Sequence, residues 1–143
     1  MTWPSAFAAT NLVALLAWAA LILLPGRGRV VPALCNGVVG ALCLFYAGAL
    51  VWALTVGFGE AGPPASFTTI EGVRAIFATD GGVTVGWTHY LAFDLVVGCW
   101  IASQADESGV SRWAQAPILL LTFLAGPAGL LVWLIVAALR RSR

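Results

Sequence analysis

Residues 6–24 read AFAATNLVALLAWAALILL and contain no charged side chain. A helix needs about 20 such residues to cross the ~30 Å hydrocarbon layer of a bilayer. No charged segment precedes the run, so we interpret it as a retained first span over 5–24 and not as a cleaved signal peptide. The fold is therefore expected to begin with a transmembrane helix.

The rest of the chain continues this pattern, since 61% of the 143 residues are hydrophobic and only 9% are charged. Soluble domains carry roughly a quarter charged residues. Further apolar runs predict spans over 30–56, 82–103 and 116–139. We expect an all-α protein with a single transmembrane domain, 1–143, that forms a bundle of four transmembrane helices.

One amphipathic helix is expected between the second and third spans, within a loop over 57–80. Glycines and prolines between 57 and 64 break the preceding span. Apolar residues then recur three and four apart over 66–79, with Glu71 and Arg74 on the other side. Such a helix lies in the membrane interface or packs across the mouth of the bundle.

The fourth span contains Gly126 and Pro127 near its middle, where the proline should kink the helix. Four spans place both ends of the chain on one side of the membrane. The positive charges that set orientation are seven arginines, since lysine is absent. Four of them would lie on the side of the chain ends and three on the other side, so the count alone does not decide the orientation. The dense group at 140–143 favours cytoplasmic ends.

Several functional classes lack any pattern in this sequence. A net charge of +1 gives no basic surface for nucleic acid. Cys35, Cys43 and Cys99 lie in separate apolar stretches and are interpreted as small buried residues. With one histidine, they form no metal-binding pattern, and no phosphate-binding or cofactor motif occurs.

The third span carries the ionisable residues that suggest chemistry. His89 is the only histidine, and Asp94 is the only carboxylate well inside any span. An ionised carboxylate at the bilayer centre costs several kcal/mol, so such a residue normally faces the bundle interior and has a partner. Candidate partners are Asn11, Asn36 and Thr122. Asp94 is then either a neutral acid or poised base, or a hydrogen-bonded structural residue.

Helical geometry sorts the third span into two stripes. Trp87, Tyr90 and Asp94 share one stripe, because they are three and four residues apart. His89 shares the other stripe with Phe93 and Trp100. His89 and Asp94 are separated by roughly 140° around the axis and cannot pair within their own helix. Two structural interpretations remain open. His89 is a histidine whose hydrogen bonds are satisfied within the bundle, or Trp87 and Tyr90 belong to an aromatic belt at the membrane interface.

The motif GWTHYLAFDL, residues 86–95, resembles the signature of the abscisic-acid-deficient-four-like membrane proteins. The stretch LTFLAGPAGLL, residues 121–131, matches a second conserved segment of that family. Its weaker N-terminal pattern is fitted by Asn11, Trp18, Pro25 and Tyr46. Cys99 departs from the family, in which an arginine is common at this place.

This resemblance implies an isomerisation within the membrane. Plant members are associated with neoxanthin synthesis, in which a 5,6-epoxide end of violaxanthin is opened to an allenic alcohol. The reaction has no net redox change and needs no cofactor. It calls for an acid at the epoxide oxygen and a base at the neighbouring vinylic C–H. The implied catalytic residues are Asp94 as acid, His89 as base and Tyr90 as hydrogen-bond donor. The candidate ligand-binding residues are Trp87, Phe93, Trp100, Asn11, Asn36 and Thr122.

Three functions are compatible with these observations. The first is a carotenoid-modifying isomerase of the bacterial inner membrane, which opens an epoxide, interconverts cis and trans double bonds or alters an end group. The second is a non-catalytic accessory or pigment-binding subunit of a larger membrane complex. The third is a small transporter or proton channel, with a water-filled path to Asp94. Expected partners are an apolar carotenoid-like substrate, membrane lipids and further subunits, of the same or another kind.

Overall fold

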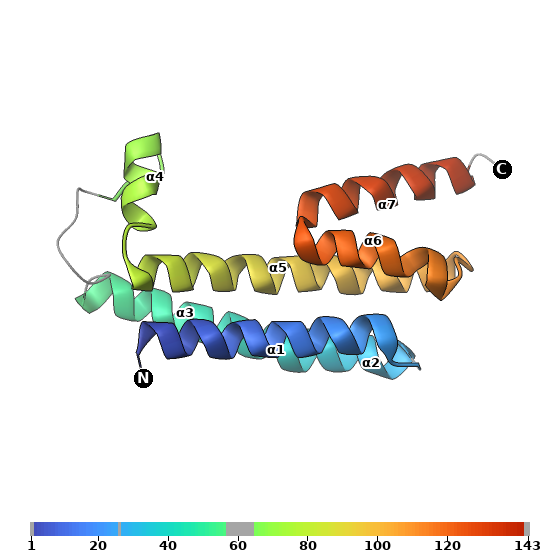
Figure 1. The fold of residues 1–143 in the computed structure, drawn as a ribbon, viewed down its shortest axis with the longest axis horizontal. Helices are drawn as coiled ribbons and strands as arrows, with labels where there is room; N and C mark the ends of the chain where they lie inside the picture. Colours follow the sequence, from blue (N-terminus) through green and yellow to red (C-terminus); the bar gives the residue numbers. More distant parts are fainter. Residues whose placement is uncertain (1, 26, 57–64, 142–143) are drawn as a thin grey trace.

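The central element of the protein is the long helix α5, Asp80–Glu107. The computed structural model describes residues 2–25, 27–56 and 65–141. Helix α1, Trp3–Leu23, lies along α5 over most of its length (Figure 1). All elements in the described residues are helical, which confirms the predicted all-α class.

A third long rod packs against α5 and consists of three helical segments in direct succession. These are α2 (Arg27–Ala33), the π-helix η1 (Leu34–Val39) and α3 (Gly40–Val56). Pro32 lies inside α2 and has no N–H to donate, so the backbone loses a helical hydrogen bond just before the π-helical stretch. The rod is nevertheless continuous from Arg27 to Val56 (Figure 1).

These three rods are long and apolar enough to cross a membrane. Even the shortest, α1 with 21 residues, reaches about 32 Å at 1.5 Å per residue. They correspond to the predicted spans 5–24, 30–56 and 82–103. The chain is therefore built as an integral membrane protein, whereas the predicted count of four spans is not confirmed.

The stretch predicted as the fourth span, 116–139, is not one helix. It is divided between α6, Arg112–Leu124, and α7, Gly126–Arg141. At Ala125 the backbone leaves the helical region, with φ −154° and ψ 69°. Figure 1 shows that α7 then runs back alongside α6. The expected kink is thus a full reversal of direction, and neither half is long enough to span a bilayer.

The amphipathic helix predicted over 66–79 is helical only in its middle. Helix α4 covers Ile70–Ile76 and begins at Thr69, whose hydroxyl accepts a hydrogen bond from the Gly72 N–H at 3.1 Å. Figure 1 shows α4 standing away from the N-terminal end of α5. The helix-breaking residues of 57–64 lie outside the described residues. The interfacial location of α4 stays a prediction.

Two contacts fix α1, α5 and α6 relative to one another. Trp18 of α1 is buried against Gly98 of α5 and against the ring of Phe123 in α6, with ring centroids 5.6 Å apart. A Cβ at Gly98 would lie 2.7 Å from a ring carbon of Trp18, so only glycine permits this close approach. Small residues thus allow the helices to pack tightly, as expected within lipid.

A buried polar cluster joins α2, α5 and α6 at one end of the bundle. We call it the Arg27 cluster, and it consists of Arg27, Asp106 and Gln115. Arg27 Nη1 lies 3.2 Å from Asp106 Oδ1 and also donates to Gln115 Oε1. Gln115 Nε2 donates to Asp106 Oδ1 at 2.8 Å and to the Val110 carbonyl at 2.6 Å. Arg27 is thus buried with only Nη1 of its guanidinium group engaged, and the contacts with Asp106 and Gln115 offset part of the cost of that burial.

Candidate functional site

Asp94 lies halfway along α5, directly beneath the break between α6 and α7. Its carboxyl group packs on the Cα of Gly126, the first residue of α7. A Cβ added to Gly126 would lie 2.6 Å from Asp94 Cγ and closer still to one carboxyl oxygen. The broken helix therefore supplies one wall of the space around the carboxyl group.

That space is a cleft of about 380 Å³, which we call the Asp94 cleft. Helix α1 contributes two side chains, α5 contributes four, and the rest come from the α6–α7 break. The lining residues are Asn11, Trp18, Trp87, Tyr90, Leu91, Asp94, Phe123, Leu124, Ala125, Gly126 and Pro127. Aromatic and aliphatic groups dominate, so the cleft suits an apolar ligand with one polar group facing Asp94.

Asn11 and Trp87 form one side of the cleft through a hydrogen bond between α1 and α5. Trp87 Nε1 donates to Asn11 Oδ1 at 3.0 Å, and Asn11 Nδ2 donates to the Phe7 carbonyl at 2.8 Å. The rings of Phe7 and Trp87 are 6.1 Å apart. These contacts fix the position of the indole, because its only polar atom is engaged.

Asp94 has no hydrogen bond or ion pair to any residue that the structure describes. Of the expected partners, Asn11 lines the same cleft but is bonded to Trp87 and Phe7. Asn36 is exposed on η1, and Thr122 is buried with its hydroxyl donating to the Ile118 carbonyl at 2.8 Å. The carboxyl group is therefore free to interact with a bound molecule.

His89 points away from the Asp94 cleft, towards α3. Its ring lies 4.5 Å from that of Phe93 and 5.6 Å from that of Tyr46, measured between centroids. Tyr90, which lines the cleft, stands edge-on to His89 at 6.4 Å. The structure thus separates the imidazole from the carboxyl group, in agreement with their positions around the helix axis.

Apart from Asn36 and Thr122, the predicted site residues fall into three groups. Asp94, Tyr90, Trp87 and Asn11 line one cleft. His89 and Phe93 contact each other beside α3. Trp100 lines a separate cavity of about 450 Å³ near the C-terminal ends of α5 and α7. The first group is the candidate site.

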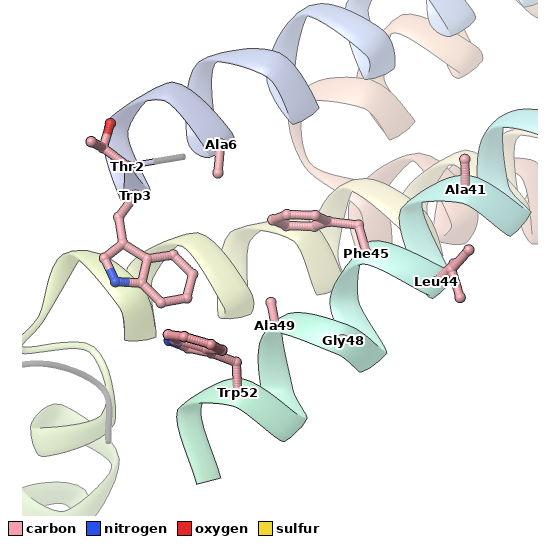
Figure 2. A pocket seen from close by; sticks show the side chains of 9 residues that line it. All are labelled: Thr2, Trp3, Ala6, Ala41, Leu44, Phe45, Gly48, Ala49 and Trp52. Atoms are coloured by element: carbon pink, nitrogen blue, oxygen red, sulfur yellow. The ribbon is translucent and has the colours of Figure 1, made fainter. Parts of the chain in front are cut away.

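A larger cavity of about 770 Å³ lies between α1 and α3, and we call it the outer groove. In Figure 2, Trp3 of α1 and Trp52 of α3 approach each other across it, with Phe45 further along. Its remaining lining residues are Thr2, Ala6, Ala41, Leu44, Gly48 and Ala49. Among the residues that the structure describes, no acid, base or nucleophile other than the Thr2 hydroxyl lines it, so chemistry is better supported in the smaller Asp94 cleft.

Sequence reasoning missed the role of Gly126 and Pro127 as a wall of the site. As a sequence pattern, Gly126-Pro127 predicts only a kink in a continuous helix. A Gly-Pro pair in the middle of an apolar run is also the sign of a discontinuous helix, and such breaks commonly form binding sites in membrane proteins. That signal would have linked the break to the only carboxylate inside a span.

Replacing Gly126 by Ala should disturb the site, because the new methyl group would overlap the Asp94 carboxyl. We expect a loss of about 1–3 kcal/mol in the free energy of unfolding, together with reduced ligand binding. Thermal unfolding in detergent measures the first effect. Gly40→Ala is the matched control, since open space surrounds Gly40. Equal stability of the two variants would contradict the packing described here.

The three long apolar helices define an all-α integral membrane protein, and a half-buried carboxyl lies in an apolar cleft between α1, α5 and the α6–α7 break. Residues 5–133 match the family described as ABA DEFICIENT 4-like, and the chain belongs to this family, which is linked to neoxanthin synthesis. The match includes every residue of the Asp94 cleft. Neither a curated protein nor a solved structure matches the chain.

Proposed function

We propose that this protein is a carotenoid isomerase that acts on an end group of its substrate inside the bacterial cytoplasmic membrane. The observation that carries the proposal is the unpaired carboxyl group of Asp94 in an apolar cleft, within a chain of the ABA DEFICIENT 4-like family. Substrate, lipid and catalytic acid would all meet within the hydrocarbon layer.

The chemistry needs a proton donor and a proton acceptor but no redox partner. In the epoxide-opening reaction, Asp94 donates its proton to the epoxide oxygen as the carbon–oxygen bond next to the polyene breaks. The neighbouring vinylic C–H loses its proton, and its electron pair becomes the new double bond of the allene. The carboxylate of Asp94 can accept that proton, so the residue returns to its starting state.

Tyr90 and Trp87 support this reaction from the same stripe of α5. The Tyr90 side chain lines the cleft, and its hydroxyl is a suitable donor to the oxygen that becomes the alcohol. The indole of Trp87, held by Asn11, offers a flat surface for the end ring of a carotenoid. His89 lies on the far side of Tyr90, so we assign direct proton transfer to Asp94 and not to the imidazole.

The size of the cleft favours an end group as the part of the substrate that enters. A cavity of about 380 Å³ holds a single substituted ring but not a whole carotenoid. The polyene would extend outward beside the exposed aromatic side chains of α5, among them Tyr90 and Phe93. The chemistry is thereby directed to the end of the molecule.

A second candidate is a pigment-binding subunit without catalysis, and the outer groove favours it. The groove is about twice as large as the Asp94 cleft and is flanked by Trp3, Phe45 and Trp52. Such a surface would hold an extended apolar molecule by contact alone. In this case carotenoid would copurify with the protein unchanged.

The proposal is tested by incubating the purified protein in lipid nanodiscs with violaxanthin, and separately with carotenoids lacking the epoxide. We expect a new chromatographic peak of unchanged mass from at least one of these substrates. Empty nanodiscs serve as the control for spontaneous isomerisation. Stable binding of every carotenoid with no new isomer would reject catalysis and support the pigment-binding alternative.

A further inference from the structure

The turns and helix ends on one side of the bundle carry most of the described arginines. We call this side the Arg-rich end, and it comprises the end of α1, the start of α2, the α5–α6 turn and the end of α7. Arg27 pairs with Asp106 across this end, and Arg112 Nη2 donates to the Ile22 carbonyl at 3.0 Å. Arg140 lines a cavity together with Gln104 of α5 and Ser108, the residue that follows α5. The end of α7 thus lies at the same end of the bundle as the end of α5 (Figure 1).

The α6–α7 hairpin reaches only part of the way across a bilayer. Helix α6 has 13 residues, which corresponds to about 20 Å, whereas a span needs ~30 Å. Asp94 is 13 residues before the end of α5, so the tip of the hairpin meets α5 at the same depth. The hairpin therefore enters and leaves at the Arg-rich end.

The surface of the hairpin suits hydrocarbon and not water. Leu131, Leu134 and Ile135 of α7 are about half exposed or more. At the tip, Gly126 is buried against Asp94, and the irregular backbone of Ala125 lines the Asp94 cleft. Irregular backbone is tolerated at membrane depth where it is buried in protein or lines a cavity.

This geometry changes the distribution of positive charge across the membrane. Among the described residues, five arginines stand at the Arg-rich end and Arg74 of α4 stands at the other; the five are Arg27, Arg29, Arg112, Arg140 and Arg141. In a four-span chain, Arg140 would instead lie opposite Arg27. Short segments rich in arginine are retained on the cytoplasmic side of membranes.

We propose that the chain crosses the membrane three times, that α6 and α7 form a re-entrant hairpin, and that the Arg-rich end faces the cytoplasm. The start of α1 then lies on the opposite side from the end of α7. This differs from the arrangement expected from four spans, in which both would lie on one side. The proposal is independent of the reaction that the protein performs.

Single cysteines report the side of the membrane on which each segment lies. Cys35, Cys43 and Cys99 are replaced by Ala, and T2C, S108C or S142C is then introduced one at a time. Cells of a bacterial host whose outer membrane has been removed and whose cytoplasmic membrane is intact are treated with a membrane-impermeant maleimide. We expect T2C to react in intact cells, and S108C and S142C to react only after the cells are opened.

Fusions to the otherwise unchanged chain provide a second measurement that does not depend on the cysteine variants. Alkaline phosphatase attached after residue 143 should be inactive, and green fluorescent protein attached there should fluoresce. Labelling of T2C and S142C from the same side would establish four spans and overturn the proposal. Labelling of S108C and S142C in intact cells, with T2C protected, would overturn the orientation.

Discussion

Carotenoid conversion is expected to fall by at least about 100-fold when Asp94 is replaced by Asn, since positioned acid–base groups contribute typically 10²–10⁴-fold. Asn has nearly the same shape and preserves the contact with Gly126, but it cannot transfer a proton to the epoxide oxygen. Binding of the substrate should remain, because aromatic and aliphatic groups form most of the cleft. The variant should therefore retain bound carotenoid while losing the reaction.

His89→Gln is the matched comparison, because it alters the other ionisable residue of the same motif. His89 contacts Phe93 and Tyr46 outside the cleft, so we expect its conversion rate to stay within about tenfold of the unmodified protein. Initial rates in nanodiscs, normalised to folded protein, measure both effects. Equal losses of conversion rate in the two variants would show that the imidazole takes part in the reaction. Unchanged product from Asp94→Asn would show that the carboxyl group does not.

Replacing Arg27 by Met should cause the largest loss of stability among single substitutions at the Arg-rich end. Breaking a buried ion pair by removing one partner costs about 3–5 kcal/mol, and we expect about 3 kcal/mol because Asp106 remains partly exposed. Gln115 is fully buried and would lose the donor to its side-chain oxygen. The junction of α2, α5 and α6 would loosen first.

Arg29→Gln provides the control for this effect, since Arg29 is exposed and lies two residues further along α2. Its loss should change the free energy of unfolding by no more than about 0.5 kcal/mol. Tryptophan fluorescence during thermal unfolding in detergent compares the two variants. Equal midpoints for both would show that the Arg27 cluster contributes little to stability.

The spans and the candidate residues of α5 could be predicted from sequence because the underlying rules are local. Hydropathy and length identify α1, the α2–α3 rod and α5 as long apolar helices. Helical periodicity separates His89 from Asp94, and the structure places them on different sides of Tyr90. Periodicity also groups Trp87, Tyr90 and Asp94, which share one cleft.

The reversal at Gly126 could not be predicted from local rules alone. A Gly-Pro pair is compatible with a kink, in which the helix continues, and with a turn, in which it folds back. The outcome depends on whether distant residues cover the broken backbone, and here Asp94 of α5 does so. Local rules also make Thr122 a candidate partner of Asp94. In the structure the Thr122 hydroxyl instead donates to the Ile118 carbonyl within α6.

The sideways exposure of α5 determines how a substrate reaches the protein. Trp87 and Tyr90 are 44% and 57% exposed at the rim of the Asp94 cleft, on a face of α5 that the other helices leave uncovered. A carotenoid would therefore arrive by two-dimensional diffusion within the lipid and never pass through water. The effective substrate concentration is then its mole fraction among the lipids, so extra phospholipid slows turnover by surface dilution even when the total amount of carotenoid is constant.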